Sequence, residues 1–371
     1  MCQNNRPSMN MIFHHTSPID SNASVGSAVR PLQMVRAFEA LGYSIDFATG
    51  YIQERKKRMR EIKKKIRSGK RYDFVYAENS NLPNSVSPTE RVPIHFLMDY
   101  SFFRTCNKHD IPIGLFYRDI YWAFGIFGKT RNPFLQRLAK TLYRYDLRIY
   151  SKTLKKMYLP SEKVGEFVPI VDSALFKALP PGGTFSINPS SKILSEKGML
   201  RLFYVGGFGG DYNMHVLFEV VSRMPNVELT ICTREHEWKL HEAEYPILSS
   251  NISIVHLFGS KMEESLLKHD IALLYVQPIP YREIAMPIKL FEYIGLNKPI
   301  IASKGTLAAD FVSEHGLGWA VDYDAESLEA LLNNLATTPK MIDDAVERIA
   351  GIKDQHTWKA RALQVVSDLT T

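Results

Sequence analysis

Cysteines are scarce in this sequence. The 371 residues include only three, Cys2, Cys106 and Cys232, which lie far apart and lack the paired spacing of a metal-binding motif. A disulfide framework needs several regularly spaced cysteines, so this scarcity excludes the class of small, cross-linked proteins. We expect the three residues to be ordinary thiols.

Long hydrophobic runs are also missing. The apolar stretch at residues 111–128 is interrupted by Arg118 and Asp119, and no segment reaches the roughly 20 apolar residues of a membrane-spanning helix. The start of the chain contains too short an apolar run for a secretory signal. These absences favour a cytoplasmic protein.

The composition is that of a folded protein with two domains. Hydrophobic residues make up 45% of the chain and charged residues 23%, which is typical of soluble globular proteins, and 371 residues suit two domains with separate cores. Turn-forming residues collect in "LPPGGTFSINPSS", at 179–191. We predict a first domain at 1–180, a linker at 181–191, a second domain at 192–350, and a C-terminal helix at 351–371 that can pack back on the first domain.

Strand-like and helix-like stretches alternate in both halves of the chain. Such alternation indicates parallel sheets covered by helices. From about residue 325 onward the pattern changes to two helices. The sequence therefore predicts an α/β protein with two doubly wound, Rossmann-like domains. The expected strands lie at residues 10–15, 44–50, 72–78, 93–99 and 111–119 in the first half, and at 199–207, 227–234, 252–259, 271–278, 299–303 and 318–323 in the second.

Residues 54–71 hold most of the excess positive charge. They contain eleven Lys or Arg and two Glu, whereas the formal net charge of the entire chain is +7. Met59, Ile62 and Ile66 add a narrow apolar stripe at helical spacing. One interpretation is a solvated helix packed through that stripe, and another is a peripheral contact with anionic lipid. Nucleic acid is not an expected partner, because no basic and aromatic recognition motif accompanies the charge.

Four glycines follow one predicted strand of the second domain. In "FYVGGFGG", Gly206, Gly207, Gly209 and Gly210 stand between a strand and a helix, where the backbone can approach a bound anion closely. The loop lacks the G-x-x-x-x-G-K-[ST] pattern of nucleoside-triphosphate sites. A plain tight turn explains the loop by itself equally well.

Charged residues follow two other strands of the same domain. Arg234 ends the strand at 227–234, while Lys289 and Glu292 begin a helix that Pro287 can open after the strand at 271–278. The carboxyl ends of parallel strands meet at one edge, where ligands bind. Because Arg and Lys suit a diphosphate and a carboxylate can accept the hydroxyls of a ribose, this edge predicts a nucleoside-diphosphate pocket. The alternative for Lys289 and Glu292 is a surface ion pair on an amphipathic helix.

Two Rossmann-like halves, with "FYVGGFGG" opening the second and "PIKLFEYIGLNKPIIAS" near its end, resemble the nucleotide-sugar glycosyltransferases of GT-B fold. The resemblance is to the large group that builds bacterial cell-surface polysaccharides, and it covers nearly the whole chain. It implies two domains that face a cleft, and a donor site that includes Met286, Ile288 and Lys289, with Glu292 on the ribose. The group's usual signature has a second glutamate eight positions before the one that contacts the ribose. In this sequence the nearest candidate, Glu283, stands nine positions before Glu292.

The first domain departs from the group's pattern at one strand end. Many relatives have a His-Asp pair there, whereas "GLFYRDIYW" has Arg118 and Asp119. Asp119 can act as a general base for an acceptor hydroxyl and Arg118 can hold a phosphate or carboxylate, or the two can form a stabilising ion pair. Gly26 and Arg30 resemble the group's first turn, which faces the donor phosphates and the acceptor.

Metal ligands and other cofactors are not expected. No Asp-x-Asp pair occurs in a context that suggests a metal-bound diphosphate, so Arg234, Lys289 and helix dipoles would replace the cation. His14 and His15 end the first strand, where isolated histidines are mostly structural.

The resulting hypothesis is a metal-independent glycosyltransferase that moves a sugar from a nucleoside diphosphate to an acceptor hydroxyl. The acceptor is expected to be lipid-linked or an oligosaccharide, in cell-surface polysaccharide biosynthesis such as capsule or exopolysaccharide assembly. Residues 54–71 would hold the enzyme against the inner face of the plasma membrane. The alternatives are a nucleotide-sugar epimerase of the same fold and a non-catalytic nucleotide-sugar-binding protein.

Overall fold

The computed structural model describes residues 9–20, 26–86, 95–118, 120–124, 132–184, 199–245 and 248–371. The chain divides into two compact units, which we call unit 1 (Met1–Pro180 with Trp358–Thr371) and unit 2 (Pro181–Thr357). The division after residue 180 coincides with the start of the expected linker, of which residues 185–191 lie outside the described ranges. Residues 351–357 belong to unit 2, and the helix that follows them belongs to unit 1.

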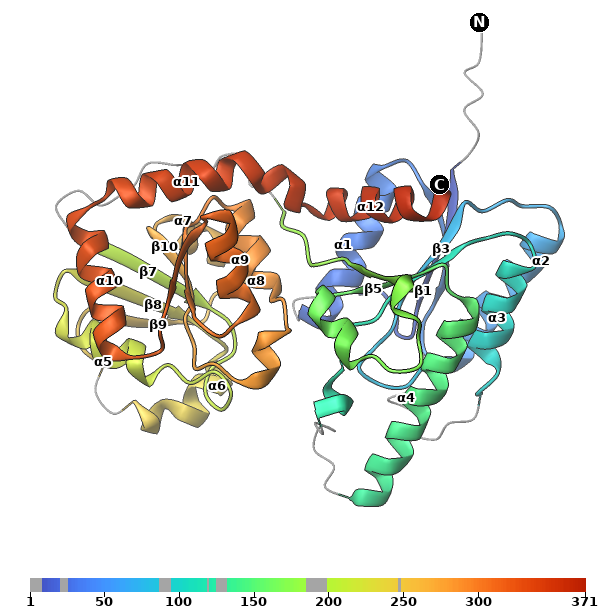
Figure 1. The fold of residues 1–371 in the computed structure, drawn as a ribbon, viewed down its shortest axis with the longest axis horizontal. Helices are drawn as coiled ribbons and strands as arrows, with labels where there is room; N and C mark the ends of the chain where they lie inside the picture. Colours follow the sequence, from blue (N-terminus) through green and yellow to red (C-terminus); the bar gives the residue numbers. More distant parts are fainter. Residues whose placement is uncertain are drawn as a thin grey trace, which may run out of the picture. The chain divides into compact units, whose positions relative to one another are not determined.

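Unit 1 is a parallel sheet with strand order β2-β1-β3-β4-β5-β6 and helices on both faces (Figure 1). Successive strands pair in parallel, as β1 pairs with β2 and β3 along its length. Strand β1 is buried over residues 11–15, as expected for an apolar run in a sheet covered on both faces. The strands are β1 (Asn10–His15), β2 (Ser44–Thr49), β3 (Phe74–Glu78), β4 (Ile113–Phe116), β5 (Lys156–Leu159) and β6 (Phe176–Ala178). The helices are α1 (Gly26–Ala40), α2 (Ile52–Arg67), α3 (Met98–Asn107), α4 (Pro133–Thr153) and α12 (Trp358–Thr370).

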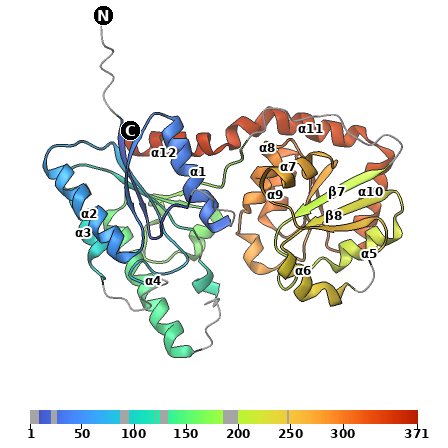
Figure 2. The ribbon, with the colours of Figure 1, turned by 180° about the vertical axis from the view of Figure 1, so that it is seen from behind.

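The last helix, α12, completes one core of unit 1. It packs beside α1, as both ribbon views show (Figures 1 and 2), and its buried Trp358, Val365 and Leu369 join a cluster with Phe13 and Phe38. The Lys177 ammonium also pairs with the Asp368 carboxylate at 2.5 Å. The C-terminal segment is therefore an integral part of unit 1.

The predicted strand at residues 93–99 is wrong over its described part, residues 95–99. Helix α3 begins at Met98, and the side chains of Phe102, Phe103 and Cys106 are fully buried at helical spacing. The Asp99 carboxylate accepts a hydrogen bond of 2.9 Å from His14 Nε2, which ties the first turn of α3 to the end of β1. Tertiary packing thus overrides a short apolar run that by itself cannot distinguish strand from helix.

Unit 2 is a second parallel sheet, with strand order β12-β11-β10-β7-β8-β9. Helices cover both faces, so each face has its own hydrophobic core. The strands are β7 (Leu200–Val205), β8 (Val227–Cys232), β9 (Ile252–Val255), β10 (Ile271–Leu274), β11 (Ile300–Ser303) and β12 (Gly318–Val321). The helices are α5 (His215–Arg223), α6 (Glu235–His241), α7 (Gly259–Leu267), α8 (Ile288–Gly295), α9 (Leu307–His315), α10 (Ala325–Thr337) and α11 (Lys340–Ile352).

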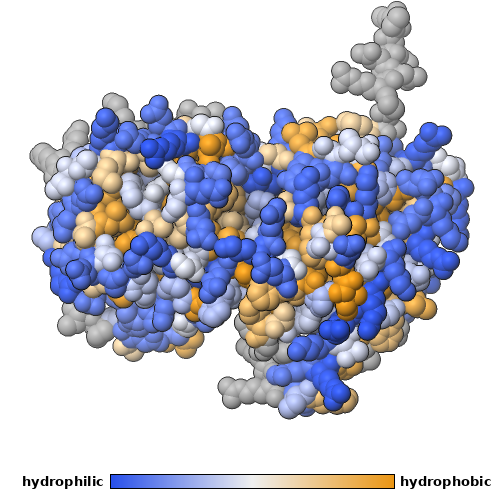
Figure 3. Space-filling model, viewed as in Figure 1, coloured by the Kyte–Doolittle hydropathy of each residue, from blue (hydrophilic) through white to orange (hydrophobic). Residues whose placement is uncertain are grey.

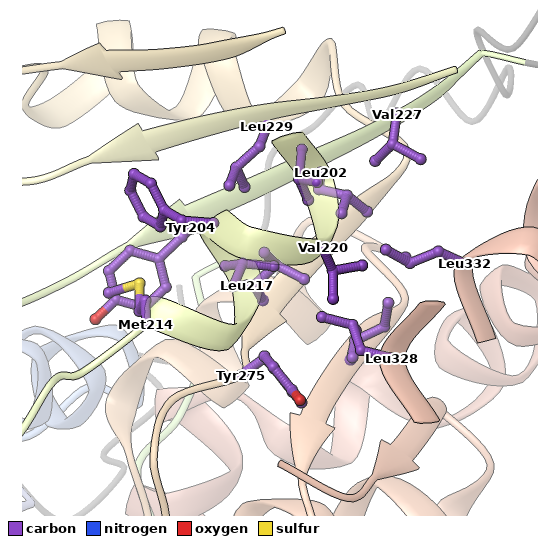
Figure 4. Close-up of a cluster of buried hydrophobic side chains, with 14 of the residues drawn as sticks. Leu202, Tyr204, Met214, Leu217, Val220, Val227, Leu229, Tyr275, Leu328 and Leu332 are labelled. Carbon is purple, nitrogen blue, oxygen red and sulfur yellow. The ribbon is translucent and has the colours of Figure 1, made fainter. Parts of the chain in front are cut away.

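One core of unit 2 joins the sheet to α5 and α10 (Figure 4). Leucines of β7 and β8 meet side chains of both helices there, and every one of them is buried. The opposite face is covered by α8 and α9, whose apolar sides pack against β7, β10 and β11. The labelled side chains in Figure 4 are Leu202, Tyr204, Met214, Leu217, Val220, Val227, Leu229, Tyr275, Leu328 and Leu332.

The chain from about residue 325 forms three helices, where the sequence predicted two. Pro339 separates α10 from α11, since proline cannot continue the hydrogen bonding of a preceding helix. A 3₁₀ turn at Lys353–His356 then separates α11 from α12. Within the described ranges, no helix combines the length and apolar composition needed to cross a bilayer.

Candidate functional site

The strand order of unit 2 reverses between β7 and β10. Strands β8 and β9 lie on one side of β7, while β10, β11 and β12 lie on the other. In an open parallel sheet, ligands bind at the carboxyl ends of the strands next to such a reversal. The loops after β7 and β10 therefore frame the candidate site.

The glycine loop after β7 is held by its own aromatic neighbours. Tyr204 donates a hydrogen bond of 2.7 Å to the Gly207 carbonyl. A Cβ on Gly207 would lie 2.8 Å from the ring of Tyr212, and one on Gly209, whose φ is 73°, would overlap the ring of His241. A glycine at 209 thus meets both a conformational and a steric requirement. Tight packing explains these two glycines, and contact with a ligand stays a prediction for Gly206, Gly207 and Gly209.

Arg282 links the two loops that frame the site. Its Nη2 donates to the Asp211 carbonyl at 2.8 Å and its Nη1 donates to the Gln277 carbonyl at 2.5 Å. The guanidinium also lies 4.9 Å from the ring centre of Tyr212. One cation therefore holds the loop after β7 against the loop after β10.

Lys289 and Glu292 occupy the first turns of α8, as predicted. Pro287 precedes the helix with φ −74° and ψ 140°, and Leu290 and Phe291 are fully buried against the sheet. The Lys289 ammonium lies 2.5 Å from the Glu292 carboxylate, and about 30% of each side chain is exposed (32% and 29%). Both groups are accessible, and each retains hydrogen-bonding capacity for a further partner.

Arg234 lies just before α6 and pairs with a glutamate that the sequence analysis did not select. Its Nη1 is 2.6 Å from Glu237 Oε1, while the other Glu237 oxygen accepts a hydrogen bond of 3.3 Å from Thr233. Half of the Arg234 side chain is exposed. The cation is thus oriented by its own helix and open to solvent.

The predicted residues of unit 2 converge around the ends of β7 and β8. Leu290 and Phe291 of α8 pack in one buried cluster with Phe203 of β7 and Cys232 at the end of β8. Tyr293, one residue after Glu292, accepts a hydrogen bond of 3.3 Å from the amide of Val205, the last residue of β7. The structure therefore brings the start of α8, with Met286 and Ile288 half-buried beside it, to the same strand ends as Arg234.

Unit 1 has a buried charge cluster at the carboxyl ends of its strands. Arg118 follows β4, and its Nη2 is 3.4 Å from the fully buried carboxylate of Glu78. Arg30 reaches the other oxygen of Glu78 at 3.5 Å, and its guanidinium carbon lies 3.4 Å from the ring centre of Phe116. The backbone amide of Arg118 donates to Asn79 Oδ1 at 2.8 Å. Two cations thus share one buried carboxylate.

The predicted general base, Asp119, lies outside the described residues. Gly26 is the first residue of α1 and belongs to unit 1, whereas the other predicted donor-binding residues belong to unit 2. Sequence reasoning missed Glu78, Glu237 and Arg282. Only Glu237 had a local signal, because it stands three residues after Arg234, at the spacing of helical ion pairs.

The two histidines at the end of β1 have structural partners. Burial lowers the pKa of His14, which donates to Asp99, and burial lowers the pKa of His15 to about 3. His15 Nδ1 lies 3.0 Å from the Ser17 carbonyl. Both rings are therefore neutral at physiological pH. In the part of the chain that the structure describes, no group of three His, Cys, Asp or Glu side chains is arranged as metal ligands.

No protein-family model and no curated protein matches this chain. Solved structures match over nearly the whole length. Anabaena HepE in complex with UDP has a TM-score of 0.65 at 12% identity, covering 98% of this chain and 100% of that one. The chain has the GT-B fold. Sucrose-phosphate synthase from Thermosynechococcus elongatus matches with a TM-score of 0.62 at 12% identity, covering 97% of this chain and 98% of that one.

WaaG, a glycosyltransferase involved in lipopolysaccharide biosynthesis, matches with a TM-score of 0.55 at 15% identity over 98% of this chain and 99% of that chain. These likenesses confirm the predicted fold class, an α/β chain with two Rossmann-like units. The identities are too low to transfer an activity, which depends on the residues of the site.

Proposed function

We propose that this protein is a glycosyltransferase that moves a sugar from a nucleoside-diphosphate donor to an acceptor hydroxyl. The observation that carries the proposal is that α8, which bears Lys289 and Glu292, packs against the ends of β7 and β8, where Arg234 follows, beside the β7–β10 reversal. That arrangement supplies two accessible cations and one carboxylate at the edge where parallel sheets bind nucleotides. Structures of the same fold in complex with UDP and with UDP-glucose support a uridine diphosphate sugar as donor.

Each residue of the donor site has a distinct role in this mechanism. The Glu292 carboxylate accepts the ribose hydroxyls, while Lys289 and Arg234 bind the diphosphate through charge-assisted hydrogen bonds. Negative charge develops on the diphosphate as the glycosidic bond breaks, so the same cations stabilise the leaving group. Arg282 acts by position, because it holds the glycine loop in place. This chemistry uses no metal ion.

The acceptor side is assigned to unit 1. Asp119 takes the proton of the acceptor hydroxyl, and Arg118 holds an anionic group of the acceptor or orients the base. The proposed acceptor is a lipid-linked or oligosaccharide chain in cell-surface polysaccharide assembly. WaaG, which shares the fold, is described as a lipopolysaccharide glycosyltransferase, and this supports the pathway class.

A peripheral contact with the inner face of the plasma membrane completes the proposal. In α2, Met59, Ile62 and Ile66 are buried against unit 1, so this helix has no apolar stripe left to insert. Its exposed Lys57, Arg60 and other basic side chains favour an electrostatic contact with anionic lipid. Vesicle binding through α2 should need anionic lipid and weaken with salt, as the Debye length falls from about 10 Å at 0.1 M to about 3 Å at 1 M.

A thermal-shift screen of nucleoside diphosphates and their sugars tests the donor site. A ligand at about one hundred times its dissociation constant should add roughly 2.7 kcal/mol of stability. We expect UDP and a UDP-sugar to raise Tm, and UMP or ADP to raise it less. No stabilisation by any nucleotide at millimolar concentration would overturn the proposal.

Product analysis separates the rival functions. Release of UDP that requires an added acceptor identifies a transferase, whereas conversion of the UDP-sugar to an isomer without acceptor identifies an epimerase. Binding without either reaction identifies a non-catalytic nucleotide-sugar-binding protein.

A further inference from the structure

The amino-terminal half of α4 projects beyond the rest of unit 1 in both ribbon views (Figures 1 and 2). The carboxyl half is anchored, since Leu142, Leu147 and Ile149 are buried. The projecting half starts at Asn132, whose side chain accepts hydrogen bonds from the amides of Phe134 and Leu135. This well-capped start keeps the projecting turns helical.

Large apolar side chains on the projecting half are exposed. The exposed fractions are 72% for Phe134, 47% for Leu135 and 39% for Leu138. The spacing of Phe134, Leu138 and Tyr145 places them along one side of the helix. The buried stripe of α4 therefore continues into solvent, instead of ending where the helix leaves unit 1.

A second exposed apolar pair extends this stripe. The ring of Phe96 makes an edge contact with Tyr145 at 6.0 Å between centres, and the Tyr145 hydroxyl donates to the Phe96 carbonyl at 3.1 Å. The next residue, Leu97, is 67% exposed. We call the exposed set Phe134, Leu135, Leu138, Phe96 and Leu97 the apolar ridge. Phe96 and Leu97 join it beside Tyr145, which lies about 16 Å along α4 from Phe134.

Positive charge lies directly beside the apolar ridge. Phe96 and Leu97 line a hollow of about 470 Å³ together with Lys56, Arg60 and Lys63 of α2. The flank of α4 beside Phe134 carries further exposed basic side chains, Arg137, Lys140 and Arg144. On the face shown in Figure 3, hydrophobic residues lie in small patches among hydrophilic ones.

We propose that the apolar ridge inserts into the interfacial region of an anionic bilayer, with the basic side chains of α2 and α4 at the level of the lipid headgroups. An exposed apolar stripe flanked by Lys and Arg is the pattern of helices that lie in a membrane interface. Charge attracts the protein to the surface and the ridge then anchors it, because the burial of aromatic and aliphatic side chains is not screened by salt. The inference deepens the membrane contact of the proposed function and rests on it.

A fluorescent label on the ridge tests insertion directly. In a Cys2→Ser background, Phe134→Cys carries an environment-sensitive fluorophore, since Cys106 and Cys232 are buried. The matched control is Leu240→Cys in unit 2, where the native leucine is 75% exposed. With phosphatidylglycerol vesicles we expect a blue shift and quenching by brominated acyl chains at position 134 and neither at position 240. Vesicle binding without any change at position 134 would overturn the insertion.

Substitution of the ridge provides a second test. Phe134→Ser with Leu138→Ser should lower the vesicle partition coefficient about tenfold or more and make the remaining binding fully salt-sensitive. Leu240→Ser should leave both unchanged. Circular dichroism checks that α4 still folds. A concentration-dependent shift of the label without lipid would instead indicate a second copy of the chain on the ridge, and would also overturn the proposal.

The outcomes distinguish this inference from the proposed function. Suppose that the protein binds a UDP-sugar and transfers the sugar to a water-soluble acceptor, but position 134 does not insert into vesicles. This result overturns only the proposed membrane insertion of the apolar ridge. Intact insertion with no nucleotide binding overturns the glycosyltransferase proposal alone.

Discussion

At the scale of single residues, the ion pair of Lys289 and Glu292 has two interpretations, as part of a nucleotide-binding site or as a surface ion pair. The two groups are 2.5 Å apart but about one-third exposed, so the pair adds at most about 1 kcal/mol to stability. A ribose hydrogen-bonded to the Glu292 carboxylate would gain more, since a bond to a charged group contributes roughly 1.5–3 kcal/mol. The two interpretations therefore predict different losses.

Glu292→Ala should weaken UDP binding by roughly 1.5–3 kcal/mol, or about 10- to 150-fold in Kd, while Tm changes little. Isothermal calorimetry measures the affinity. Glu235→Ala, which removes a fully exposed i,i+4 partner of Lys239 in the same unit, is the matched control. If folded Glu292→Ala binds UDP with unchanged affinity, Lys289 and Glu292 form only a surface ion pair.

The cluster around Glu78 predicts different phenotypes for two neighbouring residues. Arg118→Ala removes one of the two cations that share a fully buried carboxylate, so we expect a loss of stability of about 1–3 kcal/mol together with a loss of turnover. Asp119→Asn should lower kcat about 10²- to 10⁴-fold with little change in Tm, as removal of a general base does. Chemical denaturation and initial rates measure the two effects. Full activity of folded Asp119→Asn would exclude it as the base.

At the scale of elements, a buried polar network joins β1 to α2, α3 and α4. Arg55 of α2 lies 3.5 Å from the Asp99 carboxylate and donates to the Asn84 carbonyl at 2.9 Å. The amide of Asn84 donates to the Asp146 carboxyl of α4 at 2.8 Å. Burial raises the pKa of Asp99, but the charge of Arg55 and the hydrogen bond from His14 outweigh it and leave the pKa lowered.

Asp146 gives this network a defined pH dependence. Burial raises the pKa of Asp146 to about 8, although the hydrogen bond from Asn84 opposes the shift. Between pH about 4 and about 8 the unfolded chain ionises at this position while the folded protein holds the proton, so stability falls as the pH rises. Asp146→Asn removes that dependence and keeps an oxygen to accept the bond from Asn84.

Relative to the native protein, the free energy of unfolding of Asp146→Asn should rise by about 2–4 kcal/mol as the pH increases from 4 to 8. Above pH 8 the difference should stay constant. Urea unfolding at several pH values measures the difference. The exposed Asp344→Asn is the control for the chemical change. A difference that shrinks as the pH rises would contradict the assignment of a neutral, buried carboxyl.

At the scale of the whole molecule, the chain returns to unit 1 after completing unit 2. Helix α12 supplies Trp358, which is buried, and the Gln364 amide donates to the Ala178 carbonyl at 2.8 Å. The stability of unit 1 thus depends on residues 358–371, which follow the whole of unit 2 in the sequence.

Trp358→Ala should destabilise unit 1 by about 3–5 kcal/mol and leave nucleotide binding by folded unit 2 intact. Leu363→Ala, on the exposed side of the same helix, is the matched control and should change stability little. Calorimetry with and without UDP separates the two units, because only the transition of unit 2 should shift with ligand. Equal destabilisation of both transitions would show that α12 does not act on unit 1 alone.

Local sequence patterns were sufficient to predict most of the fold and the positions of some residues of the candidate site. The strands of unit 2, the helix opened by Pro287 and the positions of Lys289 and Glu292 follow from periodicity, turn residues and the rule that parallel strand ends share one edge. The same reasoning failed at residues 93–99, because a run of seven residues fits strand and helix alike until its neighbours are known.

By itself the sequence determined the alternation of strands and helices, the GT-B fold class and the strand ends that carry charge. Only the tertiary structure decided which of these charges meet. Glu78 lies between Arg30 and Arg118, and Arg282 bridges two loops. The apolar stripe of α2 is buried, whereas the apolar residues at the start of α4 are exposed. The physical reason is the distance along the sequence over which each interaction acts. Hydrophobic periodicity and helix capping depend on residues a few positions apart, whereas these contacts join segments tens of residues apart. Such contacts form only when the sheets bring those segments together.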